Sequence, residues 1–151
     1  MIKVLFGRLL ELLGEDLEEI GAWPGSPAIS LDEVVRAKKQ GVVGDSRPYG
    51  DTWRHPVREV RDMDYHIARI VYFLDHPEEV AGMDVDNGCI DNGILPTCEI
   101  VDGWHRLAAA IILNPHTVDI EYGGRVDVMD YLTGASDVRP DEPIFLDIPM
   151  Y

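Results

Sequence analysis

The stretch that decides the fold is Glu99-Ile-Val-Asp-Gly-Trp-His-Arg-Leu-Ala-Ala-Ala110. It predicts a strand, a tight turn at Asp102-Gly103 and a helix whose first turn carries His105 and Arg106. The first amides of a helix lack an intrahelical acceptor and carry about half a positive charge. Gly103 has no Cβ to keep a phosphate away, while Arg106 and His105 supply hydrogen-bond donors. We therefore expect an anion site at this helix start.

Asp102 leaves several roles open. Its carboxylate could cap the helix, hold a metal ion or act as a base. A strand, an Asp-Gly turn and a helix also occur together where no ligand binds, so a plain N-cap remains an alternative. The residues alone do not choose between these roles.

The rest of the chain predicts a small mixed sheet packed with helices. Ser30-Leu-Asp-Glu33 is a capping box for one helix, and Gly41 suits its left-handed end. The predicted helices are 2–13, 31–40, 62–75, 104–113 and 125–132, and the predicted strands are 83–85, 94–101 and 118–122. Turns are predicted at Asn87-Gly88 and Asn92-Gly93, loops at 21–27 and 41–56, and an extended tail at 140–151. We expect one α/β domain over residues 1–151, with extra N-terminal helices.

Charge and composition exclude several classes of protein. The 151 residues include 13 Lys and Arg against 28 Asp and Glu, a net charge of -15. This charge repels a phosphate backbone, so we expect weak or no general DNA binding, although carboxylates can imitate DNA phosphates. No apolar run could span a bilayer and no signal peptide is evident, so we expect no membrane partner. Cys89 and Cys98 are too few for a disulfide scaffold, which favours a cytoplasmic location.

Common catalytic motifs are missing from the sequence. It has no phosphate-binding G-x-x-x-x-G-K-[ST] loop, no H-E-x-x-H zinc motif and no G-x-S-x-G serine motif. The stretch from Asp84 begins like a calcium loop, but Cys89 and Leu95 stand where the loop requires Gly and Glu.

The stretch Asp102-Gly-Trp-His-Arg-Leu-Ala-Ala109 resembles the signature of the ParB/sulfiredoxin superfamily. The partitioning branch carries Gly-Glu-Arg-Arg, and sulfiredoxins carry Gly-Gly-Cys-His-Arg. Free-serine kinases and the DGQHR-type proteins of DNA-modification systems carry Asp-Gly-x-His-Arg, which is the closest form. Residues 64–74 and the predicted hairpin also resemble ParB-like proteins of phages and prophages. The resemblance covers about residues 60–134. The first 60 residues match no family by inspection, and 135–151 form the predicted tail.

The resemblance implies a domain whose signature helix binds the phosphates of a nucleotide such as ATP, ADP or CTP. Gly103, Trp104, His105 and Arg106 would contact the nucleotide, and Asp102 and His105 would be catalytic. Magnesium could bridge the phosphates, but no metal ligand is assigned. Trp104 replaces the sulfiredoxin Cys, which argues against that activity. Only 17 residues follow Gly134, so we expect no helix-turn-helix domain and no centromere binding.

Further residues are weaker candidates, each with a structural alternative. His66 and Arg69 share one helix face and could reach the ligand from an opposite wall. Trp53 could stack on a base, and Arg125 could meet phosphate at another helix start. The candidate bases or magnesium ligands are Glu59, Asp62 and Asp64.

Two leading hypotheses about function follow. The first is a nucleotide-binding protein, extending to a magnesium-dependent phosphotransferase or phosphohydrolase. The second is a phage-borne acidic protein that binds or inhibits a host protein and keeps the fold as a scaffold. A nuclease is a weaker third, because the net charge opposes DNA binding.

Overall fold

The computed structural model describes residues 1–14, 17–49 and 60–146. Within these residues it is a mixed α/β structure with a five-stranded mixed sheet, a two-stranded sheet and five α-helices. The chain divides into two compact units. Unit 1 combines residues 1–15, 81–103 and 115–151, and unit 2 combines residues 16–80 and 104–114. The predicted α/β class, a mixed sheet packed with helices, is confirmed.

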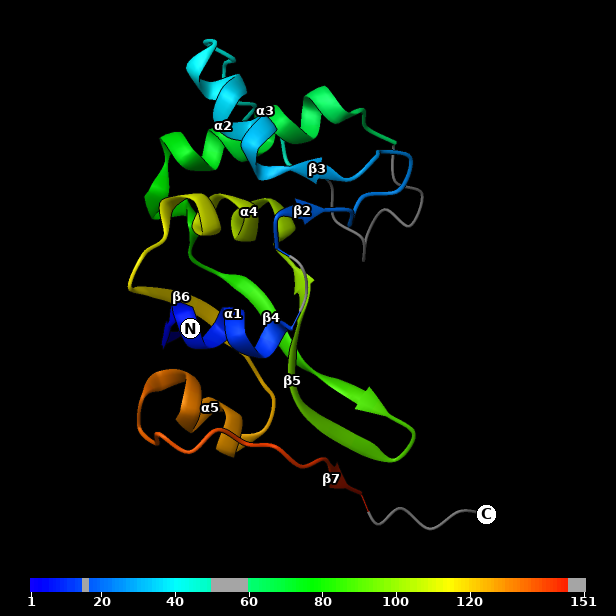
Figure 1. The fold of residues 1–151 in the computed structure, drawn as a ribbon, viewed down its shortest axis with the longest axis vertical. Helices are drawn as coiled ribbons and strands as arrows, with labels where there is room; N and C mark the ends of the chain where they lie inside the picture. Colours follow the sequence, from blue (N-terminus) through cyan, green and yellow to red (C-terminus); the bar gives the residue numbers. More distant parts are fainter. Residues whose placement is uncertain (15–16, 50–59, 147–151) are drawn as a thin grey trace. The chain divides into compact units, whose positions relative to one another are not determined.

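Unit 1 contains the five-stranded sheet, in the order β1-β6-β4-β5-β7. Strand β4 runs parallel to β6, and the other neighbours are antiparallel. Strands β4 and β5 form the long hairpin seen in Figure 1. The elements of unit 1 are β1 (Ile2–Leu5), α1 (Phe6–Leu13), β4 (Met83–Ile90), β5 (Gly93–Asp102), β6 (Thr117–Tyr122), α5 (Val126–Thr133) and β7 (Ile144–Phe145).

The prediction of a helix over 2–13 is wrong for its first residues. Ile2 to Leu5 form β1, in which Val4 lies opposite Val118 of β6 and is fully buried. Alternating β-branched residues fit a half-buried strand as well as a helix face, and pairing with β6 decides between them. Helix α1 then runs from Phe6 to Leu13 and ends at Gly14, whose φ is +63°.

The predicted turn at Asn87-Gly88 is also wrong, because both residues lie inside β4 at a shift in register. The side-chain Nδ2 of Asn87 donates to the Thr97 carbonyl at 3.1 Å. Its Oδ1 accepts from the backbone N–H of Arg125 at 2.8 Å. These bonds hold the Asn-Gly pair inside the sheet. The hairpin turn is Asp91-Asn92, between the paired residues Ile90 and Gly93.

Unit 2 contains the helices that the sequence predicts over 31–40, 62–75 and 104–113. Its elements are β2 (Glu19–Ile20), β3 (Ile29–Ser30), α2 (Leu31–Lys39), α3 (Met63–Asp75), the 3₁₀ turn η1 (Pro77–Val80) and α4 (Trp104–Leu113). Ser30 caps α2 by accepting from the Asp32 amide at 3.2 Å, and the φ of Gly41 is +89°. The short pair β2 and β3, which encloses the predicted loop 21–27, was not predicted.

Helices α3 and α4 pack side by side in unit 2 (Figure 1). Ala108, Ala109 and Ala110 are fully buried, and their small side chains let α4 approach its neighbours closely. Asp62 caps α3 by accepting from the Tyr65 amide at 2.9 Å. In the described parts of both units, no helix has the length and apolar character that crossing a bilayer requires.

Candidate functional site

The predicted signature is divided between the two units, and its first two residues end unit 1. Asp102 is the exposed last residue of β5, opposite Asp84 of β4. Gly103 has φ +115°, and a Cβ there would lie 3.1 Å from Met83 Cγ and 3.2 Å from Met83 Cα. Backbone conformation and the approach of β4 therefore both require glycine at 103, independently of any ligand.

The next three residues begin α4 in unit 2. Trp104 and Arg106 are partly exposed, whereas His105 is only 8% exposed. Nε2 of His105 lies 2.9 Å from Nδ1 of His66, which is fully buried on α3. Trp23 stacks on both imidazoles, with ring centroids 4.5 Å from His66 and 4.3 Å from His105. The structure thus brings together two separate candidates, His66 and His105, with Trp23, which was not a candidate.

Burial keeps both histidines neutral. It lowers the pKa of His66 to about 4 and that of His105 to about 3, with the nearby charges of Arg69 and Arg106 adding to the shift at His105. At neutral pH one ring donates to the other, and neither supplies positive charge to an anion. His66 Nε2 makes no hydrogen bond with any described residue.

Arg69 and Arg106 both contact the ring of Phe73. Their Cζ atoms lie 4.5 Å and 5.0 Å from its centroid. Arg69 is 9% exposed and donates to the Asp45 carbonyl at 3.1 Å, while Arg106 Nε donates to the Glu79 carbonyl at 2.9 Å. Burial lowers the pKa of Arg69, and the nearby charge of Arg106 adds to that shift.

Neither Arg69 nor Arg106 forms an ion pair with any described carboxylate. The carboxylate of Asp45 binds Arg47 instead, with Nη2 and Oδ2 2.6 Å apart, which lowers the pKa of Asp45 to about 2. Arg125 of unit 1 differs, because Asp127 and the carbonyls of Ile94 and Glu142 use its donors. Arg69 and Arg106 therefore remain able to bind an anion. The side chain of Arg125, by contrast, has a structural role, which is an alternative to its predicted phosphate contact.

Of the candidate carboxylates that the structure describes, Asp62 and Asp64 form no hydrogen bond or ion pair with the signature helix. Asp62 caps α3, while Glu59 and the candidate base-stacking residue Trp53 lie outside the described residues. Ligand atoms of the kind that hold metals gather instead at His76, Glu78 and Glu79, within 4.8 Å of one another. The sequence signal for this group is a His and two Glu around the proline that follows α3.

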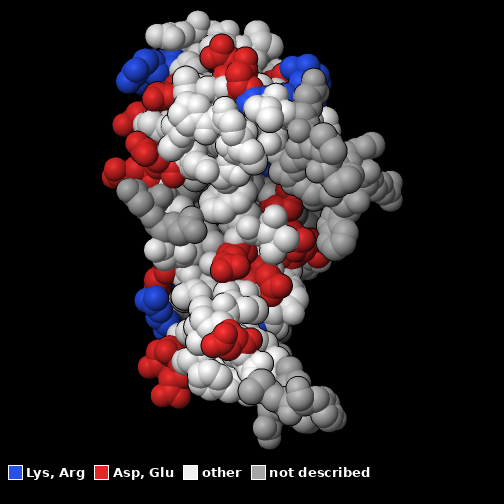
Figure 2. Space-filling model, turned by 90° about the vertical axis from the view of Figure 1, so that its right-hand side faces the viewer, with Lys and Arg blue, Asp and Glu red and all other residues white. Residues whose placement is uncertain are grey.

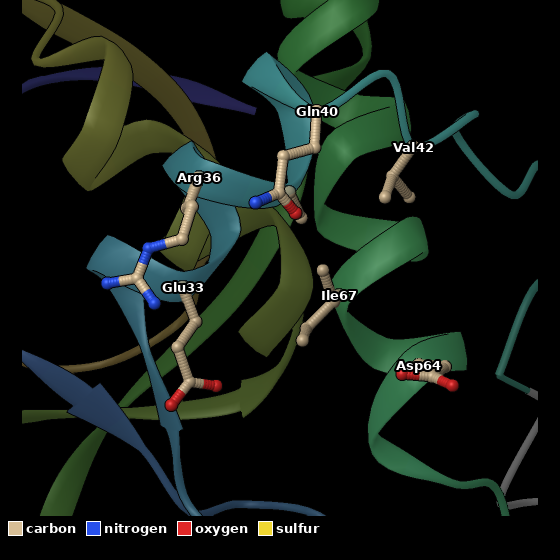
Figure 3. Close-up of a pocket in the computed structure, with 7 residues that line it drawn as sticks. Glu33, Arg36, Gln40, Val42, Asp64 and Ile67 are labelled. Atoms are coloured by element: carbon tan, nitrogen blue, oxygen red, sulfur yellow. The ribbon is translucent and has the colours of Figure 1, made fainter.

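Asp64 lies at a separate pocket of about 430 Å³ between α2 and α3. Figure 3 shows Glu33, Arg36 and Gln40 on the α2 side and Ile67 with Asp64 on α3. Its lining includes the carboxylates of Glu33 and Asp64 together with apolar side chains such as Ile67. The pocket therefore suits a basic group better than an anion, for which Arg36 is the one lining arginine.

Comparison of the chain with protein-family models, with curated protein sequences and with solved structures finds no match.

Proposed function

We propose that unit 2 binds the phosphate of a nucleotide at the start of α4, through Arg106 and Arg69. The observation that carries the proposal is the pair of guanidiniums on Phe73, which have no described carboxylate partner in a chain of net charge -15. The buried charge of Arg69 has no ion-pair partner among the described carboxylates, which is costly, and a bound phosphate would compensate it. Free amides in the first turn of α4 would add donors.

The histidines enter this proposal as positioning residues. The bond from His66 to His105, together with Trp23, fixes the start of α4 against α3. Such rigidity keeps Arg106 in place before the ligand arrives. This role replaces the phosphate contact expected of His105, because a buried neutral imidazole already bonded to another offers little to an anion.

Trp104, Gly103 and Asp102 keep the roles that the resemblance implies. Trp104, partly exposed at the start of α4, would contact the nucleotide, and Asp102 would be catalytic. ATP, ADP and CTP remain the candidate nucleotides, with magnesium as a bridging ion. Phosphoryl transfer or hydrolysis would then depend on positioning and charge neutralisation by the two arginines.

A ligand series tests the proposal. Calorimetric titration of the full chain with a nucleoside and its mono-, di- and triphosphate, in ATP and CTP series, measures the contribution of phosphate. We expect affinity to rise with phosphate number and to fall with salt. Equal affinity for nucleoside and triphosphate, or no heat at about millimolar ligand, would overturn it.

A second function is favoured by acidic pairs on the β4–β5 hairpin. Asp84 lies opposite Asp102, and Asp86 lies opposite Glu99, all four exposed. Like charges directly across a sheet are destabilising, and none of the four forms an ion pair with a described cation. Acidic side chains are widespread on the face in Figure 2. A basic host protein would relieve this repulsion.

Protein-detected NMR with a Lys-rich peptide tests this second function. Shift changes concentrated on β4 and β5, and lost in the Asp86→Asn/Glu99→Gln variant, would support it. Changes spread evenly over all acidic residues would contradict it, because they would show non-specific attraction.

A further inference from the structure

Asp45 and Arg47 form a closed ion pair in the loop 44–47 of unit 2. Asp45 Oδ1 accepts from the backbone N–H of Arg47 at 2.9 Å, which is the bond of an Asx turn. This turn brings the guanidinium of Arg47 back onto the same carboxylate, where Nε lies 3.0 Å from Oδ1 and Nη2 lies 2.6 Å from Oδ2. Both oxygens of the Asp45 carboxylate are therefore bound by Arg47.

The loop 44–47 lies directly against α3. A Cβ at Gly44 would lie 2.6 Å from Tyr72 Cα, so glycine is required for this close approach. The backbone N–H of Asp45 donates to the Ala68 carbonyl at 3.0 Å. The backbone of Asp45 is thus fixed beside α3, whichever partner its side chain takes.

Arg69 of α3 is a second cation beside Asp45. Its Nη1 donates to the Asp45 carbonyl at 3.1 Å, and the residue is only 9% exposed. Burial lowers the pKa of Arg69, and the charge of Asp45 opposes that shift, so the two charges already act on each other. Because the carbonyl and the carboxylate belong to one residue, a carboxylate released by Arg47 would have Arg69 as its neighbouring buried cation. A buried guanidinium gains from such a partner.

We propose that Arg47 keeps the anion site of unit 2 open by holding the Asp45 carboxylate away from Arg69. Arg47 is then a positioning residue, which does not itself contact the anion. Without Arg47, the carboxylate pairs with Arg69 and competes with phosphate at every ligand concentration. A competitor that occupies Arg69 about nine-tenths of the time weakens phosphate binding about tenfold. The competition rests on the proposed function, whereas the exchange of partners by Asp45 does not.

NMR of the arginine side chains at neutral pH tests the exchange of partners without any anion. We expect the Nε–H resonance of Arg69 to shift in Arg47→Ala and to return when Asp45→Asn is added. Asp45→Asn keeps the backbone bonds to α3 and removes only the charge, so in the wild type it should shift this resonance much less. Equal responses to Asp45→Asn in the two backgrounds would overturn the exchange.

Calorimetric titration of the full chain with inorganic phosphate tests the competition. We expect Arg47→Ala to weaken binding about three- to tenfold, and Arg47→Ala/Asp45→Asn to bind within about twofold of the wild type. Arg36→Ala removes an exposed arginine of α2 and should bind like the wild type, which controls for the lost charge. Arg47→Ala/Asp64→Asn restores the same net charge at an exposed residue of α3 and should stay as weak as Arg47→Ala.

Recovery in Arg47→Ala/Asp45→Asn alone separates competition from a direct contact between Arg47 and the anion. Weak binding that persists in this double variant, or wild-type affinity in Arg47→Ala, would overturn the proposal. Failure of the proposed function has a different signature. No heat with phosphate in the wild type would overturn the anion site and with it the competition, while the NMR shifts still show whether Arg47 holds the carboxylate away from Arg69.

Discussion

His66 Nδ1 and His105 Nε2 are 2.9 Å apart, and both rings lie stacked on Trp23. A residue of α3 and the second residue of α4 are thereby joined through buried, neutral imidazoles. One nitrogen must donate and the other accept, so the pair tolerates only one shared proton. The start of α4 consequently depends on the protonation of two side chains.

The first prediction concerns pH. The folded-state pKa values, about 4 for His66 and about 3 for His105, lie below the ordinary value of 6.5. The unfolded chain therefore takes up protons first, and stability that is complete above pH 6.5 falls as the pH drops toward 4. Urea unfolding between pH 7 and 5 should show a total loss of about 2 kcal/mol for each histidine, because the slope approaches about 1.4 kcal/mol per pH unit only well below pH 6.5. A flat profile over this window, in which most carboxylates stay charged, would contradict the burial of the pair.

The second prediction concerns the bond between the two rings. His105→Ala should lower the free energy of unfolding by about 1–3 kcal/mol, because the buried Nδ1 of His66 loses its partner. His66→Ala should behave similarly. The double variant should cost less than the sum of the two, leaving a coupling energy of about 0.5–3 kcal/mol by urea unfolding. Strict additivity would argue against a direct hydrogen bond.

Gly103 gives the third prediction. Gly103→Ala should destabilise the protein by about 1–3 kcal/mol, because φ is +115° and Met83 occupies the space of the new Cβ. Gly123→Ala is the matched control, since no atom lies within 4 Å of its added Cβ, and it should change stability by less than about 0.5 kcal/mol. Thermal unfolding of the two variants measures the difference. Equal melting temperatures would show that the turn tolerates a side chain.

Binding to DNA gives the fourth prediction. At a net charge of -15, random duplex DNA should bind more weakly than micromolar at ~150 mM salt. Fluorescence anisotropy with a labelled duplex checks this. Sub-micromolar affinity for random sequence would instead favour the nuclease hypothesis.

The sequence predicted elements with strong local signals most accurately. Helix α4 begins at Trp104 and ends at Leu113 as predicted, because an Asp-Gly turn precedes it and Asn-Pro follows it. Ile2 to Leu5 and Asn87-Gly88 were assigned wrongly, because pairing partners distant in sequence decide their conformation. Local periodicity and turn propensity contain no information about such partners.

The candidate site could be predicted in part. The signature and the shared face of His66 and Arg69 were visible in the sequence, and the structure places both residues beside the start of α4. The burial of His105 and the participation of Trp23 could not be foreseen, because Trp23 is about 80 residues away in a segment of loop composition. The likeness to the ParB/sulfiredoxin superfamily and nucleotide binding itself stay predictions.

Calorimetric titration of a nucleoside triphosphate into wild type, Arg106→Ala, Arg106→Lys and the control Arg36→Ala tests the central claim most directly. Arg36 is an exposed arginine of α2 in the same unit. We expect Arg106→Ala to weaken binding roughly 10- to 150-fold, which corresponds to a charge-assisted contact of about 1.5–3 kcal/mol. Arg106→Lys should restore it only partly, and Arg36→Ala should match the wild type. Equal affinities in all four proteins would contradict the phosphate site at Arg106.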